Sequence, residues 1–222
     1  MAEIEVIKNI LGENDRVAAE NQAMFAKKGV YVLNLMGSPG AGKTSVLEKT
    51  MEHLAGKTRM AVIEGDLFTS RDAERIEKHG VPVVQINTAG GCHLDAPMVQ
   101  KVAQKLALDA VDLLIIENVG NLVCPAEFAI GEDDKAVVLS ITEGDDKPMK
   151  YPLIFKESAI ALLNKVDILP YCDFDMAAAK EDILTLHPGM KVMEISCTKG
   201  QGVAAWCDWL LAKVTDKKEQ QV

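Results

Sequence analysis

Short apolar runs alternate along the chain with stretches in which apolar residues recur at the spacing of an α-helix. Such alternation predicts strands connected by helices, the pattern of a parallel α/β sheet. Strands are predicted at 30–35, 60–63, 81–86, 112–117, 136–141, 159–163 and 191–195. Helices are predicted at 1–28, 45–54, 70–78, 94–108, 177–186 and 203–214, with a polar loop at 143–148 and a frayed charged tail at 215–222. We therefore predict a doubly wound, mostly parallel sheet flanked by helices, with functional loops at the carboxyl ends of its strands.

The first predicted helix, at 1–28, is an arm that precedes a single domain at 29–222. Apolar side chains recur along it at helical spacing, first Ile4, Ile7 and Leu11 and then Val17, Met24 and Phe25. Gly29 follows and ends the helix. Two interpretations are open: the apolar stripe packs against the domain's own sheet, or it is a docking arm for another protein.

The segment between the first predicted strand and the helix at 45–54 is glycine-rich and ends in Gly-Lys-Thr. Its spacing is that of a phosphate-binding P-loop, whose backbone N–H groups surround a nucleotide's phosphates at a helix N-terminus. We predict that Lys43 contacts the β- and γ-phosphates and that Thr44 holds Mg²⁺. The alternative is a glycine turn that precedes Lys and Thr by chance. The nucleotide contacts predicted in this P-loop NTPase segment are Gly37, Ser38, Gly40, Ala41, Gly42, Lys43, Thr44 and Ser45.

An Asn-Lys-x-Asp sequence, formed by Asn164, Lys165 and Asp167, follows the strand predicted at 159–163. Guanine offers a ring N–H beside an amino group, and the Asp167 carboxylate can accept from both, which adenine does not allow. We predict that Asn164 braces the loops and that the Lys165 stem lies across the base. Ser196 and Cys197 follow the last strand, where a backbone amide would reach the guanine oxygen, although this segment also suits simple turn chemistry.

Mg²⁺ requires oxygen ligands besides Thr44, because it is a small hard cation with octahedral geometry. Asp66 follows the second predicted strand and Glu117 ends the fourth, so both carboxylates are expected near the phosphates. We predict that they hold Mg²⁺ or position the attacking water, and that Gly120 offers its N–H to the γ-phosphate. Lys43, Asp66 and Glu117 are thus the predicted catalytic residues. The alternative is that each carboxylate caps a loop.

Cys92, His93 and Cys124 form a candidate site of a softer kind. Two thiolates and an imidazole suit Zn²⁺ or Ni²⁺ rather than Mg²⁺. Their spacing is not that of a zinc finger, and three ligands leave a tetrahedral site incomplete, so water, a substrate-like ligand or a second subunit must complete it. On spacing alone, two buried thiols and a loop histidine are the competing interpretation.

Composition narrows the class of protein only a little. The chain has 222 residues, enough for one domain with a substantial core, and its net charge of −9 argues against nucleic acid as a general partner. No apolar run approaches the ~18 residues of a membrane-spanning helix, and the first residues lack the features of a signal peptide, so no membrane partner and a cytoplasmic location are expected. Five cysteines, an odd number, favour reduced thiols or metal ligands over a disulfide framework.

Three stretches closely resemble the HypB family of hydrogenase nickel-incorporation GTPases: Gly90–Ala96, Ile116–Pro125 and Thr142–Asp146. The similarity runs through nearly the whole chain, and Glu-Asn-Val-Gly-Asn-Leu-Val-Cys-Pro is its most specific part. Two departures stand out. Residues 1–28 hold neither the cysteines nor the histidines that some members carry there, and Pro97 occupies a position where some relatives have a histidine.

The resemblance implies a low-turnover GTPase that binds GTP or GDP with Mg²⁺ and forms a homodimer on GTP. It also implies Zn²⁺ or Ni²⁺ binding by Cys92, His93 and Cys124 at the subunit interface. Nickel would then be delivered to a [NiFe]-hydrogenase large-subunit precursor with a HypA-type chaperone. Two alternatives remain: a metallochaperone or scaffold whose nucleotide site is largely regulatory, and a urease-type maturation GTPase.

Overall fold

The computed structural model describes the backbone of residues 2–66 and 75–220 and the side chains of residues 12–65 and 75–220. Within these ranges the strands form one seven-stranded sheet in the order β3-β2-β4-β1-β5-β6-β7, and every pairing is parallel. This confirms the predicted doubly wound fold. The strands are β1 (Tyr31–Gly37), β2 (Met60–Asp66), β3 (Val83–Asn87), β4 (Leu113–Glu117), β5 (Asp134–Ser140), β6 (Ile160–Asn164) and β7 (Lys191–Ile195).

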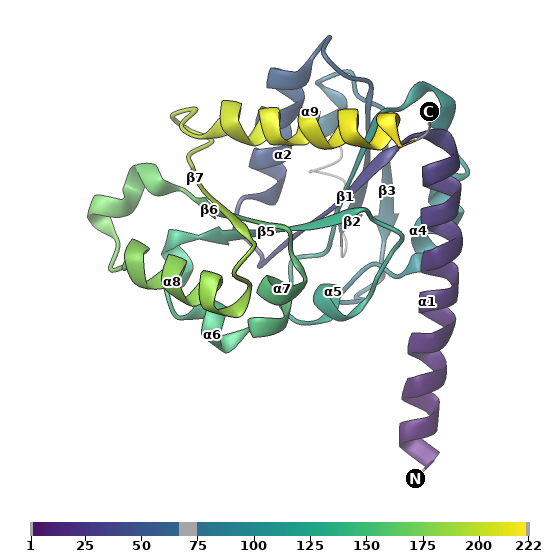
Figure 1. Ribbon diagram of the computed structural model, residues 1–222, viewed down its shortest axis with the longest axis horizontal. Coiled ribbons are helices and arrows are strands. Elements are labelled where there is room, and N and C mark those ends of the chain that lie inside the picture. The colour runs from purple at the N-terminus through teal and green to yellow at the C-terminus, as the bar shows by residue number, and fades with distance from the viewer. Residues whose placement is uncertain (1, 67–74, 221–222) are drawn as a thin grey trace.

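Helices cover both faces of this sheet (Figure 1). On one face, α2 (Lys43–Leu54) and α9 (Val203–Glu219) pack against alternate residues of β1 such as Leu33 and Leu35. The other face is covered by α1 (Ala2–Lys28) and α4 (Ala96–Ala103), and farther along the sheet by α5 (Cys124–Glu127), α7 (Pro152–Glu157) and α8 (Met176–Leu186). Because both faces are covered, central strands such as β4 are buried along their whole length and are apolar except at their ends.

The described side chains of α1 pack against the domain. Asn14, Val17, Ala18, Asn21 and Phe25 are buried at helical spacing, and Phe25 joins the core beneath α4. The Asn21 amide donates to the carbonyls of Ala96 at 2.9 Å and Ile130 at 3.0 Å. The amino-terminal part of α1 projects beyond the rest of the chain (Figure 1), and the side chains of Ile4, Ile7 and Leu11 lie outside the described residues.

Several predicted boundaries are wrong. The helix predicted at 94–108 spans only Ala96–Ala103, because Asp95 caps its start and a separate turn of 3₁₀-helix follows at Leu108–Ala110. The loop predicted at 143–148 is partly wrong, because α6 (Lys147–Lys150) begins inside it. The sequence pattern missed both α6 and α7, two short helices that each carry proline in the first turn. Of the helix predicted at 70–78, residues 70–74 lie outside the described residues and 75–77 are helical.

The charged tail is not frayed as predicted, because α9 continues to Glu219. Lys217 on this extension pairs with Asp133 at 2.5 Å, and Lys218 pairs with Asp112 at 2.9 Å. Farther back on α9, Trp206 is buried, stacks on Trp209 and donates its indole N–H to Thr50 Oγ1 at 2.8 Å. These contacts fix α9 against the sheet and against α2.

Candidate functional site

The P-loop lies between the end of β1 and the start of α2. Gly42 has φ +99°, and a Cβ atom there would lie 2.4 Å from the Asn164 amide nitrogen, so both the backbone angle and the space favour glycine. The buried Lys43 side chain donates to the carbonyls of Gly37 at 3.2 Å and Ser38 at 3.3 Å. The Ser38 hydroxyl in turn donates to the Glu143 carboxylate, which follows β5. These hydrogen bonds tie the loop to the end of β1 and to the segment after β5.

A cavity of about 460 Å³ opens beside the P-loop. Its lining includes two residues that the sequence reasoning missed, Glu64 on β2 and Arg75 just after the undescribed segment. Arg75 lies in the helix predicted at 70–78 and Glu64 directly follows the strand predicted at 60–63, but neither belongs to a motif, so only the three-dimensional arrangement identifies them. The predicted residues that line this cavity are Gly40, Gly42, Lys43, Thr44, Ser45, Glu117, Gly120 and Lys165.

Three oxygen-bearing side chains meet at the floor of this cavity. The Thr44 hydroxyl donates to Glu117 Oε1 at 2.8 Å, and Glu64 lies directly beside Glu117 in the register of β2 and β4. Both carboxylates are buried, and two neighbouring buried carboxylates favour a cation or a proton between them. This donor set fits a hard ion such as Mg²⁺. Asp66, predicted for the same role, ends β2, and its side chain lies outside the described residues.

The Asn-Lys-x-Asp residues lie at the end of β6 and reach the P-loop from the side. The Asn164 amide donates to the Ala41 carbonyl at 2.9 Å, and Lys165 Nζ donates to the Gly40 carbonyl at 2.7 Å. Lys165 has φ +66°, a left-handed conformation that its contacts hold in place. The bracing predicted for Asn164 is therefore present in the structure.

Asp167 faces the segment that follows β7. The Ser196 hydroxyl donates to Asp167 Oδ1 at 2.6 Å, and Cys197 Sγ lies 3.8 Å from Asn164 Oδ1. Burial raises the pKa of the Cys197 thiol to about 11, so this cysteine is a neutral thiol near pH 7. The residues predicted to contact guanine thus lie together, on the side of the P-loop where Lys165 crosses it.

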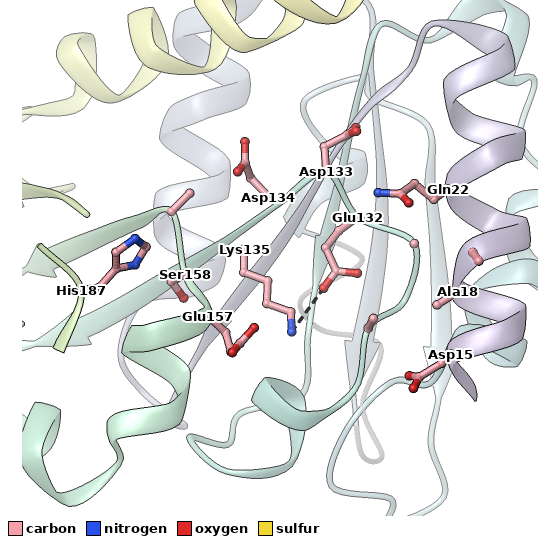
Figure 2. Close-up of a pocket in the computed structure, with 14 residues that line it drawn as sticks. Asp15, Ala18, Gln22, Glu132, Asp133, Asp134, Lys135, Glu157, Ser158 and His187 are labelled. Carbon is pink, nitrogen blue, oxygen red and sulfur yellow. Dashed lines mark ion pairs between the residues drawn. The ribbon is translucent and has the colours of Figure 1, made fainter. Parts of the chain in front are cut away.

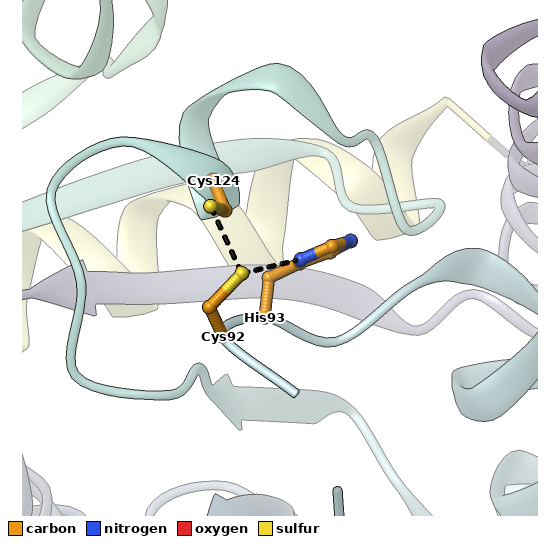
Figure 3. Close-up of side chains that lie close together, drawn as sticks. All are labelled: Cys92, His93 and Cys124. Carbon is orange, nitrogen blue, oxygen red and sulfur yellow. Dashed lines mark hydrogen bonds between the residues drawn. The ribbon is translucent and has the colours of Figure 1, made fainter. Parts of the chain in front are cut away.

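The structure brings Cys92, His93 and Cys124 together (Figure 3). Cys92 Sγ lies 3.0 Å from Cys124 Sγ and 3.5 Å from His93 Nδ1, and the candidate ligand atoms of the three residues lie within 4.8 Å of one another. Cys92 is exposed and Cys124 half-buried, so the competing interpretation of two buried thiols is wrong. His93 stacks on Phe128 with ring centroids 4.0 Å apart, and burial lowers the pKa of its imidazole, which favours the neutral, ligating form.

The loop after β4 joins this cluster to the P-loop. The Asn121 backbone N–H donates to the Gly37 carbonyl at 3.0 Å, and the Asn121 side-chain amide donates to the Cys92 carbonyl at 3.3 Å. A Cβ atom at Gly120 would come within 2.9 Å of Pro39, which shows how closely this loop and the P-loop approach each other. One asparagine therefore contacts the P-loop and the thiol cluster at once.

A second cavity, of about 510 Å³, lies at the amino ends of β5 and β6, between α1 and the end of α7 (Figure 2). Several carboxylates line it, and the described lysines neutralise those on the first residues of β5 and just before it. Lys135 pairs with Glu132 at 3.7 Å, and Lys213 pairs with Asp134 at 2.8 Å. No motif residue of the sequence analysis lines it, so the candidate site is the smaller cavity beside the P-loop.

A P-loop and an Asn-Lys-x-Asp strand end, side by side on an all-parallel sheet, define a GTPase of the P-loop class. Residues 31–194 match the CobW/HypB/UreG nucleotide-binding domain. The hydrogenase maturation factor HypB of Azotobacter chroococcum is 50% identical over 208 residues, which cover 93% of this chain and 68% of that relative. The corresponding factor of Escherichia coli K12 is 48% identical, over 95% of this chain and 72% of its own length. The chain therefore belongs to the HypB family of hydrogenase maturation factors.

Solved structures agree with this assignment. The crystal structure of HypB from Helicobacter pylori in complex with nickel superposes with a TM-score of 0.87 at 38% identity, covering 93% of this chain and 97% of that one. HypB from Archaeoglobus fulgidus gives the same TM-score at 36% identity, covering 92% of this chain and 100% of that one. Among the described residues, no helix combines the length and the apolar character needed to cross a bilayer.

Proposed function

We propose that this chain hydrolyses GTP and uses the nucleotide to control a nickel ion bound by Cys92, His93 and Cys124, which it delivers to a [NiFe]-hydrogenase precursor. Mg²⁺ is the ion proposed at Thr44 and the neighbouring carboxylates, and Zn²⁺ competes for the thiol cluster. The proposed setting is the cytoplasm, where thiols stay reduced. The proposed partners are a second copy of the chain, a HypA-type chaperone and the large-subunit precursor.

The observation that carries this proposal is the double contact of Asn121. Its backbone donates to the P-loop residue Gly37, and its side chain donates to the main chain of Cys92. The segment from Glu117 to Cys124 thus begins beside Thr44 and ends at a thiol. Any shift of this segment on nucleotide exchange would change the spacing of the sulfur and nitrogen atoms that hold the metal.

In GTP hydrolysis the protein forms no covalent bond to the substrate, and its role is to position groups and stabilise charge. Water forms a bond to the γ-phosphorus, the bond to the β–γ bridging oxygen breaks, and GDP and hydrogen phosphate leave with release of one proton. Lys43 offsets the charge that develops on the phosphates, and Glu117 orients the Thr44 hydroxyl. Mg²⁺, when bound, neutralises charge on the β- and γ-phosphate oxygens.

The test is the affinity for Ni²⁺ with GDP and with a non-hydrolysable GTP analogue, measured by titration calorimetry. We expect the two affinities to differ by about 5- to 150-fold, the usual range of coupling between sites. Asn121→Ala, which removes the side-chain bond to Cys92 and keeps the backbone bond to Gly37, is expected to shrink the difference. Equal affinities in the wild-type chain would contradict the proposal. Lys43→Ala is the control, since its Ni²⁺ affinity should not respond to nucleotide.

Three protein ligands leave the metal site incomplete, which supports a second subunit, water or a substrate-like ligand as the remaining donor. We expect GTP-dependent dimerisation, visible as a shift in size-exclusion chromatography with light scattering when GDP is replaced by the GTP analogue. A chain that stays monomeric with both nucleotides would favour water or another small ligand as the fourth donor.

Two alternatives can be separated from this proposal. A metallochaperone with a merely regulatory nucleotide site predicts nickel transfer that survives Lys43→Ala, whereas the proposed GTPase predicts its loss. A urease client is favoured by one relative, the hydrogenase/urease maturation factor HypB of Helicobacter pylori, which is 40% identical over 95% of this chain. Deletion of the gene in its host, with both enzyme activities assayed, would distinguish the two clients.

A further inference from the structure

One positively charged side chain that lines the nucleotide cavity belongs to neither sequence motif. Among the described residues that line it, the cationic side chains are Lys43, Lys165 and Arg75. Lys43 and Lys165 both donate to carbonyls of the P-loop itself. Arg75 comes from a different part of the chain, the short helical stretch 75–77 after β2. It therefore approaches the cavity from outside the P-loop.

The Arg75 guanidinium is held in the cavity by a carboxylate of α2. Nε donates to Glu48 Oε1 at 3.0 Å and Nη2 to Glu48 Oε2 at 2.6 Å, a bidentate pair. Glu48 lies four residues after Thr44, which places it one helical turn farther along α2 on the same face. The partner of the guanidinium is thus one turn away from the residue proposed to hold Mg²⁺.

The backbone that carries Arg75 is firmly anchored. The next residue, Ile76, is fully buried and packs in the core formed by α2, α9 and the sheet. The chain then turns tightly, with the His79 N–H donating to the Ile76 carbonyl at 3.0 Å. Arg75 and Glu48 both keep partial exposure, at 40% and 22% of their side chains, so the ion pair can be exchanged at little cost in burial.

We propose that Arg75 is a catalytic residue for GTP hydrolysis, whose guanidinium leaves Glu48 to contact the transferring phosphoryl group. This inference rests on the proposed GTPase function and assigns one further group to it. A planar guanidinium matches phosphate oxygens bidentately, as it matches a carboxylate, so a bound triphosphate competes directly with Glu48 for the same donors. Glu48 then keeps the arginine in place while the cavity lacks a phosphate.

The competing explanation is a structural ion pair that joins residues 75–77 to α2. That role predicts equal effects from removing either partner, because both substitutions break the same pair. A catalytic role predicts unequal effects, because Glu48→Gln leaves the guanidinium available and Arg75→Ala does not. The pair of variants therefore separates the two roles, whatever each does to folding.

The experiment is single-turnover hydrolysis of Mg²⁺–GTP by the full chain, with GDP affinity and melting temperature measured for each variant. We expect Arg75→Ala and Arg75→Lys to slow hydrolysis by about 10³-fold, the lower end of what an arginine supplies to phosphoryl transfer. GDP affinity should change less than about threefold, because the effect belongs to the transition state. Glu48→Gln should hydrolyse GTP at the wild-type rate or faster.

Binding of GDP with aluminium fluoride, which mimics the transferring phosphoryl group, gives a second readout and should be lost in Arg75→Ala alone. The matched control is Arg59→Ala, since Arg59 makes the same bidentate pair with Asp112 far from the cavity. Wild-type rates in Arg75→Ala, or equal losses in Arg75→Ala and Glu48→Gln, would overturn this inference while the GTPase stands. A wild-type chain that does not hydrolyse GTP would instead overturn the proposed function.

Discussion

The two cavities of this molecule are similar in size, but the lysines near them have different partners. At the amino ends of the strands, Lys135, Lys213 and Lys217 pair with carboxylates. Beside the P-loop, Lys43 and Lys165 donate to main-chain carbonyls. A carboxylate offsets the charge of the lysine that it pairs with, whereas a main-chain carbonyl is neutral; Arg75 is the exception beside the P-loop, since it pairs with Glu48 until, as proposed, a phosphate takes the place of that carboxylate. The amino end is therefore built for stability and the carboxyl end for binding.

The most direct test of this difference is to remove one lysine at the carboxyl ends of the strands and one at their amino ends. Lys43→Ala should lower the rate of GTP hydrolysis by about 10³-fold, because a positioned charge on the phosphates is lost. Lys135→Ala should leave that rate unchanged and lower the free energy of unfolding by about 1–3 kcal/mol, because Glu132, whose side chain is only 5% exposed, loses its ion partner. Steady-state phosphate release and urea denaturation measure the two effects. Slower GTP hydrolysis by Lys135→Ala would contradict the assignment of stability to the amino end and of binding to the carboxyl end.

A smaller effect is expected from changing the proposed base contact at the carboxyl end. Asp167→Asn replaces an acceptor pair with an amide that donates, so GTP affinity should fall by about 10²-fold or more. Xanthosine triphosphate, which carries an oxygen where guanine has its amino group, should then bind better than GTP. Fluorescent-nucleotide competition measures both affinities. Retained preference for GTP would show that Asp167 does not read the base.

The smallest effect concerns Asp112, at the amino end of β4. Hydrogen bonds from Arg59 and then Lys218 hold the pKa of its carboxyl well below the usual range. A lowered folded-state pKa stabilises the fold above the ordinary value of about 3.9, and this stability is lost as pH falls below it. Asp112→Asn should therefore cost about 1–2 kcal/mol at pH 7, and the difference from wild type should shrink below about pH 4.

Thermal unfolding of both chains between pH 3 and pH 7 measures that difference. The GTPase rate at pH 7 is the control, and it should be the same in both chains. A gap in stability that stays constant with pH would show that Asp112 contributes through packing and not through its charge.

The sequence predicted where the strands lie along the chain and that they run parallel, because each is a short apolar run and helices alternate with them. It did not predict their order in the sheet. The last strand, Lys191–Ile195, matches its prediction residue for residue. Short helices such as α6 escaped because four residues are too few to show a helical period. The tail 215–219 was misjudged because its lysines suggested solvent, whereas Lys217 and Lys218 are held by aspartates at the start of distant strands.

In the candidate site, too, some residues could be predicted from the sequence and others could not. The P-loop residues could be predicted because they are consecutive in the sequence, so their spacing alone determines how they are arranged in space. Cys92 and Cys124 are far apart in sequence, so residue types suggested a metal site but only the fold shows that their sulfurs lie 3.0 Å apart. Glu64 and Arg75 belong to no motif and could not be predicted, because only the packing of β2 against β4 and of residues 75–77 against α2 brings them to the cavity.

Both tryptophans of the chain lie on α9, and one of them is hydrogen-bonded to Thr50 on the helix that begins with the P-loop lysine. The tryptophan fluorescence of this protein therefore comes from a single helix in contact with α2. Nucleotide titrations can be followed by that emission without any attached dye.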